Sequence, residues 1–335
     1  MTDSTTTQTI TRTLGTDGQP VSAIGFGCWA IGGPASREGN PIGWGEVDDD
    51  ESIDAIHAAL EAGVTFFDTA NVYGAGHSER VVARALAGRR DDVVIATKFG
   101  NLIDEEARLA TGHGSSPESI RQQCEDSLRR LETDVIDLYQ FHIGDFPSPG
   151  PLSQDGLARA GEVRDALEGL VDDGKIKSYG WSTDDPERAA FFARGEHCSA
   201  IQQSFSVVNG NADTLAVCEQ QGLASIVRGP LSMGLLTGKM SRETTFSDTD
   251  TRRGWDWNGE QGRRLDALDK VKDILTEDGR SLAQGALGWL LARSAAFVPI
   301  PGIRTVAQAK DNAGVLAVGP LTGDQLTRIA ALLEQ

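Results

Sequence analysis

The sequence predicts an α/β protein, a single (β/α)8 barrel that extends over residues 1–335 and carries an N-terminal β-hairpin. From about residue 50 onward, short apolar runs alternate with longer stretches of helical periodicity, a pattern typical of βα units around a parallel sheet. No linker rich in Gly, Pro or Ser divides the chain, so a closed barrel is favoured over a doubly wound open sheet. The strand-like segments number about eight and are centred near Ile24, Phe66, Val94, Leu138, Ser178, Ile201, Ile226 and Val298.

The first elements carry clear start and stop signals. The segment TRTLGTDGQPVSAIGFG has an Asp-Gly turn between two short apolar stretches, which predicts a hairpin that closes the bottom of the barrel. Asp49 and Asp50 stand at the start of a helix, where the helix dipole favours acidic residues, and Gly63 ends it. Ser116 followed by Pro117 predicts another helix start, because serine caps the N-terminus and proline is favoured at the first helical position.

The remaining strands follow from short apolar segments separated by helical stretches. Residues 241–261 lack periodicity and are expected to form a long loop after the seventh strand, on the face where barrel active sites lie. Within this loop, Trp255 and Trp257 could either line a substrate pocket or pack against the rim of the barrel. Residues 1–10 are expected to be disordered. The later strand segments are VTFFDTA, VVIATK, VIDLYQFH, KIKSYGWS, AIQQSF, LASIVRG and FVPIPG.

Composition and charge exclude several classes of function. The 335 residues include 49 acidic and 31 basic ones, a formal net charge of -18, so a nucleic-acid backbone or an anionic membrane would be repelled. The apolar runs fall far short of the ~20 residues that span a bilayer, and the N-terminus lacks the features of a signal peptide, which predicts a cytoplasmic protein. The four cysteines form no CxxC pair and the five histidines no HxH or HExxH motif, so no metal site is expected.

Two common enzyme motifs are not found in the sequence. The glycines of IGFGCWAIGG follow a strand, but they do not form G-x-G-x-x-G, and the acidic residue that ends the next strand, Asp68, is about 40 residues away rather than about 20. The GxSxG turn of α/β-hydrolases is absent as well. The glycines are therefore interpreted as residues that permit tight turns at the barrel mouth.

Four polar residues fall at the ends of predicted strands. Asp68 ends the second strand, Tyr73 follows five residues later, Lys98 ends the third strand and His142 ends the fourth. The carboxyl ends of barrel strands converge on one face, so these side chains are expected to meet. A phenol is a poor acid–base group at neutral pH, but a nearby cation such as Lys98 moves its pKa toward the working range. Asp68 would keep Lys98 charged, and His142 could donate a hydrogen bond to a substrate carbonyl oxygen.

The segments FFDTANVYGAGHSE, ATKFG and LYQFH resemble the signature segments of the aldo-keto reductase superfamily, and the resemblance covers nearly the whole chain. It implies a (β/α)8 barrel that binds NADPH in extended form without a separate dinucleotide domain and uses no metal. It also implies that Asp68, Tyr73, Lys98 and His142 form the catalytic tetrad, with Tyr73 as the proton donor in carbonyl reduction.

The same resemblance implies a set of cofactor-binding residues. Ser182 and Gln203 would contact the nicotinamide carboxamide, with Thr183 where asparagine is usual, and Arg228 replaces the aromatic residue that many members place under the ring. The positions that would wrap the pyrophosphate are Leu231, Gly234, Leu236 and Lys239, and those that would clasp the adenosine end are Gly302, Arg304, Gln308 and Asn312. Because a guanidinium forks onto a phosphate, Arg304 favours NADP(H) over NAD(H).

The function expected from these residues is reversible hydride transfer between NADP(H) and a small-molecule carbonyl, alcohol or sugar substrate. A second hypothesis is a cofactor-binding regulatory protein with little turnover, since the superfamily includes channel-associated β-subunits that resemble its enzymes. The physiological substrate, the preferred direction and the oligomeric state stay open at this point.

Overall fold

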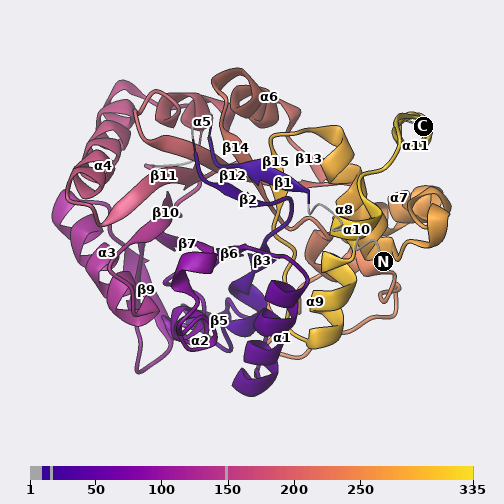
Figure 1. Cartoon of the computed structure of the whole chain (residues 1–335), viewed down its shortest axis with the longest axis horizontal. Coiled ribbons are helices and arrows are strands. Elements are labelled where there is room, and N and C mark those ends of the chain that lie inside the picture. The colour runs from indigo at the N-terminus through magenta and orange to yellow at the C-terminus, as the bar shows by residue number, and fades with distance from the viewer. Residues whose placement is uncertain (1–9, 16–17, 148–149, 335) are drawn as a thin grey trace, which may run out of the picture.

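Parallel strands form a closed barrel at the centre of the molecule (Figure 1). The computed structural model describes residues 10–15, 18–147 and 150–334. The ring closes because the Gly25 N–H donates to the Pro299 carbonyl at 2.8 Å and the Gly27 N–H donates to the Pro301 carbonyl at 2.9 Å. This confirms the predicted fold class. The barrel strands are β3 (Phe26–Gly27), β6 (Phe66–Asp68), β7 (Val94–Phe99), β10 (Ile136–Phe141), β11 (Ile176–Ser182), β12 (Cys198–Ser206), β14 (Ala224–Arg228) and β15 (Phe297–Pro299).

Helices surround the barrel, and α7 and α11 pack against each other outside the ring (Figure 1). The predicted helix starts agree with the structure: Asp49 begins α1, and Ser116 caps the helix that begins at Pro117. The N-cap of α1 is Asp48, which was not singled out from the sequence and whose side chain accepts from the Asp50 and Glu51 N–H groups. The helices are α1 (Asp49–Glu61), α2 (His77–Ala85), α3 (Pro117–Leu131), α4 (Gln154–Asp172), α5 (Pro186–Phe192), α6 (Ala212–Gln221), α7 (Glu260–Leu275), α8 (Leu282–Arg293), α9 (Val306–Ala313), α10 (Val315–Val318) and α11 (Gly323–Leu333).

The N-terminal hairpin closes one end of the barrel, as predicted. Strands β1 (Thr11–Thr13) and β2 (Pro20–Ser22) pair antiparallel. Leu14 and Val21 are buried in one cluster with inward-facing strand residues such as Phe66 and Leu138. Residues 1–9 of the segment expected to be disordered, and residues 16–17 of the predicted turn, lie outside the described residues.

Alternation along the strands separates the barrel interior from the helix-covered face. In β10, Tyr139 and Phe141 pack in the large cluster between strands and helices, whereas Leu138 belongs to the interior cluster. Successive side chains of a strand point to opposite faces, so Gln140 must point inward with Leu138. The interior is therefore apolar near the hairpin and becomes polar toward the carboxyl ends of the strands.

A small sheet lies at the carboxyl end of the barrel, and the sequence did not predict it. Its strands are β4 (Ser36–Arg37), β5 (Asn40–Pro41), β8 (Asn101–Asp104) and β9 (Leu109–His113). The segment 32–47 that carries β4 and β5 also contacts the long loop 241–261, because Trp44 and Asp250 form a bridge and the Thr251 N–H donates to the Gly43 carbonyl at 3.0 Å. The long loop therefore reaches the barrel mouth through Asp250 and Thr251.

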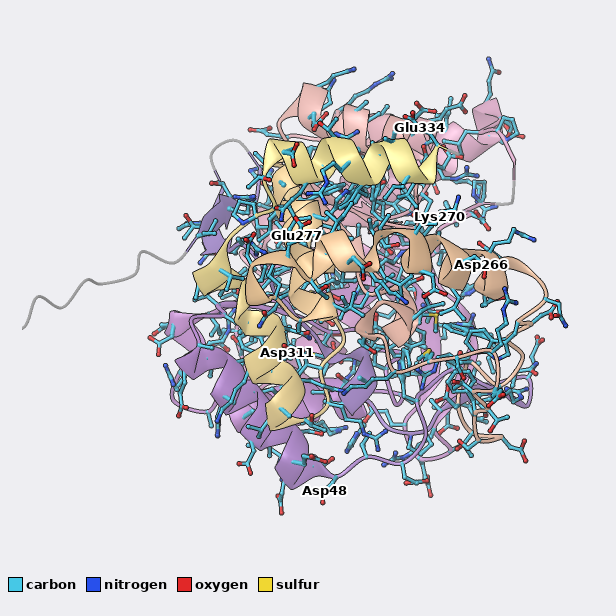
Figure 2. All side chains as sticks on the ribbon, turned by 90° about the vertical axis from the view of Figure 1, so that its right-hand side faces the viewer. Asp48, Asp266, Lys270, Glu277, Asp311 and Glu334 are labelled. Carbon is cyan, nitrogen blue, oxygen red and sulfur yellow. The ribbon has the colours of Figure 1, made fainter. Side chains whose placement is uncertain are left out.

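The acidic character of the chain is visible on the side formed by α1, α7, α9 and α11 (Figure 2). Asp48, Asp266 and Glu334 lie exposed there, so the charges of these three carboxylates are solvated. None of the helices within the described ranges is both long and apolar enough to cross a membrane.

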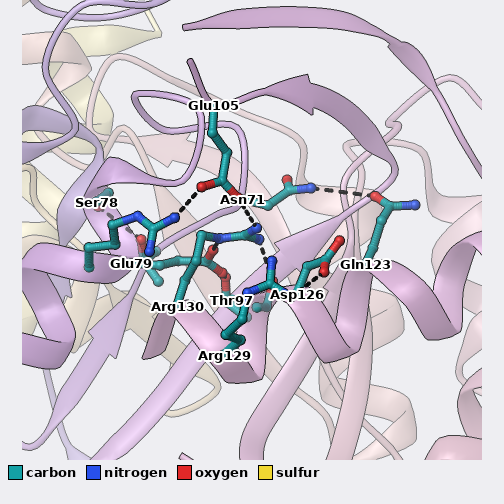
Figure 3. Close-up of polar contacts among 12 residues, drawn as sticks. Asn71, Ser78, Glu79, Thr97, Glu105, Gln123, Asp126, Arg129 and Arg130 are labelled. Atoms are coloured by element: carbon teal, nitrogen blue, oxygen red, sulfur yellow. Dashed lines mark hydrogen bonds and ion pairs between the residues drawn. The ribbon is translucent and has the colours of Figure 1, made fainter. Parts of the chain in front are cut away.

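A buried ion pair joins α2 and α3 behind strand β7 (Figure 3). Glu79 is fully buried, and its carboxylate accepts from the Thr97 hydroxyl at 2.6 Å and from Arg130 Nε at 2.6 Å. The Arg130 guanidinium also donates to Glu105 at 2.9 Å and to Ser127 Oγ at 3.2 Å. The pair thus ties two helices to the strand that carries Lys98.

Candidate active site

The structure brings the four predicted catalytic residues together at the barrel mouth. Asp68 is the last residue of β6, Lys98 lies near the end of β7, and His142 directly follows β10. Tyr73 lies in the loop between β6 and α2. Asp68 and Lys98 point into the barrel, because their neighbours Phe67 and Phe99 pack on the outer face.

Lys98 is the centre of the hydrogen-bond network. Its ammonium donates to Asp68 Oδ1, to the Thr69 carbonyl at 2.8 Å and to the Tyr73 hydroxyl oxygen at 3.2 Å. Lys98 is fully buried and Asp68 is 1% exposed, so the ion pair is shielded from water. An ammonium group has three protons to donate, and three acceptors are present.

Two glutamines that the sequence did not single out complete the shell around Asp68. Its second carboxylate oxygen, Oδ2, accepts from Gln140 Nε2 at 3.1 Å and from Gln202 Nε2 at 2.9 Å. A buried carboxylate requires such partners, because desolvation otherwise exceeds the attraction of its counterion. Alternation along β10 and β12 predicts that neighbouring residues take opposite faces, but which face is the inner one is decided by the barrel.

The pKa values of Tyr73 and Lys98 are both raised. For Tyr73, burial raises the pKa of the phenol, and the nearby charge of Lys98 lowers it by less. For Lys98, burial lowers the pKa, but Asp68 and Tyr73 outweigh that effect. The sequence predicted that Lys98 would lower the pKa of the phenol toward the working range. Lys98 does act in that direction, but burial raises the pKa of Tyr73 by more than Lys98 lowers it. Tyr73 is therefore protonated at neutral pH.

His142 stands beside Tyr73 as a neutral imidazole. The two rings meet edge to face with centroids 6.1 Å apart and an interplanar angle of 87°. Burial lowers the pKa of His142 well below its usual range, and the charges of Lys98, Arg228 and Arg37 lower it further. Its Nδ1 atom is buried and has no hydrogen-bond partner among the described residues. A neutral imidazole can donate one hydrogen bond to an oxygen atom held near Tyr73.

Aromatic side chains form one wall of the site. The Trp29 ring stacks on Tyr73 with centroids 6.0 Å apart, and Trp44 meets Trp29 edge-on at 5.1 Å. The Arg252 guanidinium lies 4.4 Å from the centre of the Trp44 ring and is paired with Asp250. Neither Trp29 nor Trp44 was assigned a role from the sequence; the place of Trp29 two residues after the barrel strand β3 was the available signal.

Ser182 lies on the inward face of the barrel, but the Gln203 side chain does not. Ser182 ends β11 and shares the inward face of that strand, since Trp181 packs outward. The Gln203 side chain lies on the outer face of β12, 2.8 Å from Ser225 Oγ and 3.1 Å from the Asn211 carbonyl. Its assignment to the cofactor site is therefore corrected: Gln202, one residue earlier and of opposite face, is the glutamine that reaches the site.

Arg228 and the segment after β14 lie at the rim of the mouth. Arg228 Nη2 contacts Asp184 Oδ2 at 2.5 Å, within a cleft of about 490 Å³ that Gly144, Asp145, Asp184, Asp185, Pro186, Asn211 and Arg228 line. Leu231 and Leu236 are buried in the core, so only their backbone could face a ligand. Gly234 has a φ of 94°, a left-handed conformation that favours glycine, and Lys239 is exposed.

The residues expected at the adenosine end lie on and before α9. The Arg304 N–H donates to Gln308 Oε1 at 2.8 Å, and the Arg304 guanidinium donates to the Glu46 carbonyl. Gln308 and Asn312 are four residues apart and share a helix face. Gly302 is exposed, and a Cβ atom there would lie 3.8 Å from the nearest atom, so the surface beside it is open.

The tryptophans of the long loop pack against the barrel rim and not into the site. The Trp255 ring lies 5.5 Å from Phe246 and 5.7 Å from Trp257, and the Trp257 indole N–H donates to the Thr244 carbonyl at 2.9 Å. Both rings pack on the main hydrophobic cluster. Of the two alternatives that the sequence left open, the structure therefore favours packing.

The variant Trp255→Ala with Trp257→Ala is expected to lower Tm and to leave substrate selectivity unchanged. Truncating a fully buried tryptophan costs about 3–5 kcal/mol, and these half-buried rings should cost less each. Calorimetry measures the loss of stability, and kcat/KM for a bulky and a small aldehyde measures selectivity. A tenfold loss confined to the bulky aldehyde would contradict the packing role.

Comparison with known proteins places the chain in one family. The model of the Aldo/keto reductase family matches residues 23–334. The aldo-keto reductase YhdN of Bacillus subtilis is 32% identical over 299 residues, 87% of this chain and 84% of that protein. The NADH-specific methylglyoxal reductase of Escherichia coli is 28% identical over 315 residues, 91% of this chain and 93% of that protein.

Similar solved structures are consistent with this family. A glycerol dehydrogenase from Gluconobacter oxydans has a TM-score of 0.81 and 33% identity over 98% of this chain and 95% of that chain. An aldo/keto reductase from Klebsiella pneumoniae, in complex with NADP and acetate, has a TM-score of 0.67 and 26% identity over 96% of this chain and 95% of that chain. The barrel, the Asp68–Lys98–Tyr73 network and these matches together show that the chain belongs to the aldo/keto reductase family.

Proposed function

We propose that this protein is an NADP(H)-dependent reductase that reversibly transfers a hydride between the nicotinamide and an aldehyde, ketone or sugar. The observation that carries the proposal is the contact of Lys98 Nζ with the Tyr73 hydroxyl, 3.2 Å away, beside a neutral His142. This arrangement can deliver one proton to a carbonyl oxygen at the barrel mouth.

The residues around the mouth fit a nicotinamide dinucleotide. Ser182 and the inward-facing Gln202 can bind the carboxamide, and the open surface at Gly302 leaves room for the adenosine end near Arg304. Within the described residues the Arg304 guanidinium forms no ion pair, which supports binding of the 2′-phosphate of NADP(H). The similar proteins include one that was solved in complex with NADP and one that is NADH-specific.

The mechanism assigns one task to each residue of the tetrad. When bound, the nicotinamide supplies or accepts the hydride. In reduction, the Tyr73 hydroxyl donates its proton to the substrate oxygen, and the Lys98 ammonium stabilises the phenolate that remains. Asp68 keeps Lys98 charged, while His142 donates a hydrogen bond that orients the carbonyl. In oxidation, the Tyr73 phenolate accepts the proton of the alcohol.

The proposed function is tested by following nicotinamide absorbance with NADPH and with NADH against a panel of aldehydes, ketones and aldoses. We expect turnover that persists over many cycles with at least one class of carbonyl. Stoichiometric cofactor binding with no sustained turnover on any member of the panel would instead favour the regulatory alternative.

Replacing Arg304 with alanine is expected to weaken NADPH binding by about 1.5–3 kcal/mol and to leave NADH binding nearly unchanged, because the charged guanidinium would lose its contact with the 2′-phosphate. Fluorescence titration with both cofactors measures the difference. Lys310→Ala, at an exposed position of α9, is the matched control and should change neither affinity. Equal losses for NADPH and NADH in the Arg304 variant would exclude this role.

A further inference from the structure

Buried polar atoms without partners gather at the barrel mouth. Among the described residues they include three nitrogen atoms there: Arg37 Nε, Trp44 Nε1 and His142 Nδ1. Buried polar groups in folded proteins are almost always hydrogen-bonded, so each exception requires an explanation. These atoms are closed off from solvent, so they show that the protein leaves polar groups unpaired beside the proposed reacting groups.

Arg37 is the charged member of this set, and it is held close to the tetrad. It belongs to β4 of the small sheet, and its Nη2 atom donates to Asn101 Oδ1 at 2.5 Å. The same Asn101 side chain donates from Nδ2 to the His142 carbonyl at 3.5 Å. A single amide therefore links the Arg37 guanidinium to the main chain of His142, and the Arg37 side chain stays partly exposed.

The charge of Arg37 is not balanced within the described residues. No carboxylate lies within 4.0 Å of its guanidinium there, whereas two other arginines of the rim, Arg228 and Arg252, pair with Asp184 and Asp250. The positive charge of Arg37 acts on the site, because it helps to lower the pKa values of His113 and His142. A partly buried, unpaired guanidinium gains most from an anion that can accept its N–H groups.

We propose that Arg37 binds an anionic oxygen group, a carboxylate or a phosphate, at the end of the substrate opposite the carbonyl that Tyr73 protonates. The inference rests on the proposed function and specifies its substrate class: an oxo-acid or a phosphorylated aldehyde or ketone. The guanidinium offers parallel N–H donors to two oxygens of such a group, and Asn101 fixes its orientation.

The test compares matched substrates with wild-type enzyme and variants. The pairs are 4-oxobutanoate with butanal, and glyceraldehyde 3-phosphate with glyceraldehyde, which separate the carboxylate from the phosphate. We expect wild type to prefer the anionic member of at least one pair by tenfold or more in kcat/KM. Arg37→Gln should remove most of that preference through KM and leave the neutral member within threefold, and Arg37→Lys should restore part of it. Higher salt should raise KM for the anionic member only.

A binding measurement separates this inference from catalysis. Succinate should raise the Tm of the NADPH-loaded wild-type enzyme more than succinamide does, and Arg37→Gln should abolish the difference. Arg253→Gln is the matched control, because Arg253 contacts Asn40 of the same small sheet at 3.0 Å and should change neither readout. Turnover of neutral aldehydes without preference for anions, or an equal loss for both members of a pair in Arg37→Gln, would overturn the inference while the proposed function stands. Absence of turnover with every carbonyl would overturn both.

Discussion

Tyr73→Phe is expected to lower kcat for carbonyl reduction by at least about 100-fold and to leave NADPH affinity nearly unchanged. Phenylalanine keeps the ring that stacks on Trp29 and removes only the hydroxyl that contacts Lys98 Nζ at 3.2 Å. His142 is a poor replacement for this acid, because burial lowers its pKa and leaves the imidazole neutral. Steady-state kinetics measure kcat, and fluorescence titration measures cofactor affinity.

Tyr139→Phe provides the matched control for this variant. Tyr139 is buried in β10, but its ring stacks on Phe99 on the outer face of the barrel, away from Lys98. Loss of the Tyr139 hydroxyl should leave kcat within about threefold of wild type. If Tyr73→Phe kept more than a tenth of the wild-type kcat, another group would have to be the proton donor.

Arg130→Met is expected to lower the free energy of unfolding by about 3–5 kcal/mol, because it leaves the buried Glu79 carboxylate without its cation. The ion pair is sealed from water, with the Arg130 side chain 2% exposed and the Glu79 side chain 0% exposed. Thr97 would still donate to Glu79, but one hydroxyl does not replace a guanidinium. Urea unfolding followed by circular dichroism measures the change.

Two further variants test that explanation of the Arg130 effect. Arg129→Met removes the neighbouring arginine of α3, whose pair with Asp126 is largely exposed, and it should produce no measurable change (Figure 3). Glu79→Gln combined with Arg130→Met should recover part of the loss, since a neutral amide can still accept from Thr97. An equal loss in the single and the double variant would show that packing, and not the unpaired charge, sets the cost.

The sequence by itself determined the barrel, the hairpin and the catalytic set. Alternating apolar and helical segments fix a parallel sheet, and each of its strands delivers its last residues to the same face. Asp68, Lys98 and His142 therefore meet at the mouth whatever the details of packing, and Tyr73 follows on a short loop. Local signals such as Asp49, Asp50 and Ser116 were sufficient to predict the starts of α1 and α3 close to where the structure has them.

Only the tertiary structure decided which face of a strand a residue takes and what it meets there. Gln202 and Gln203 are adjacent and chemically identical, so the sequence does not distinguish them until the register of β12 turns one toward Asp68 and the other toward Ser225. Other features also depend on segments far apart in the chain. They are the small sheet, the contact of Trp29 with Tyr73 and the position of Arg37 beside Asn101 without a carboxylate partner among the described residues. Such contacts form because the closed barrel brings its loops together at one end, and no local pattern of residues encodes which loops become neighbours.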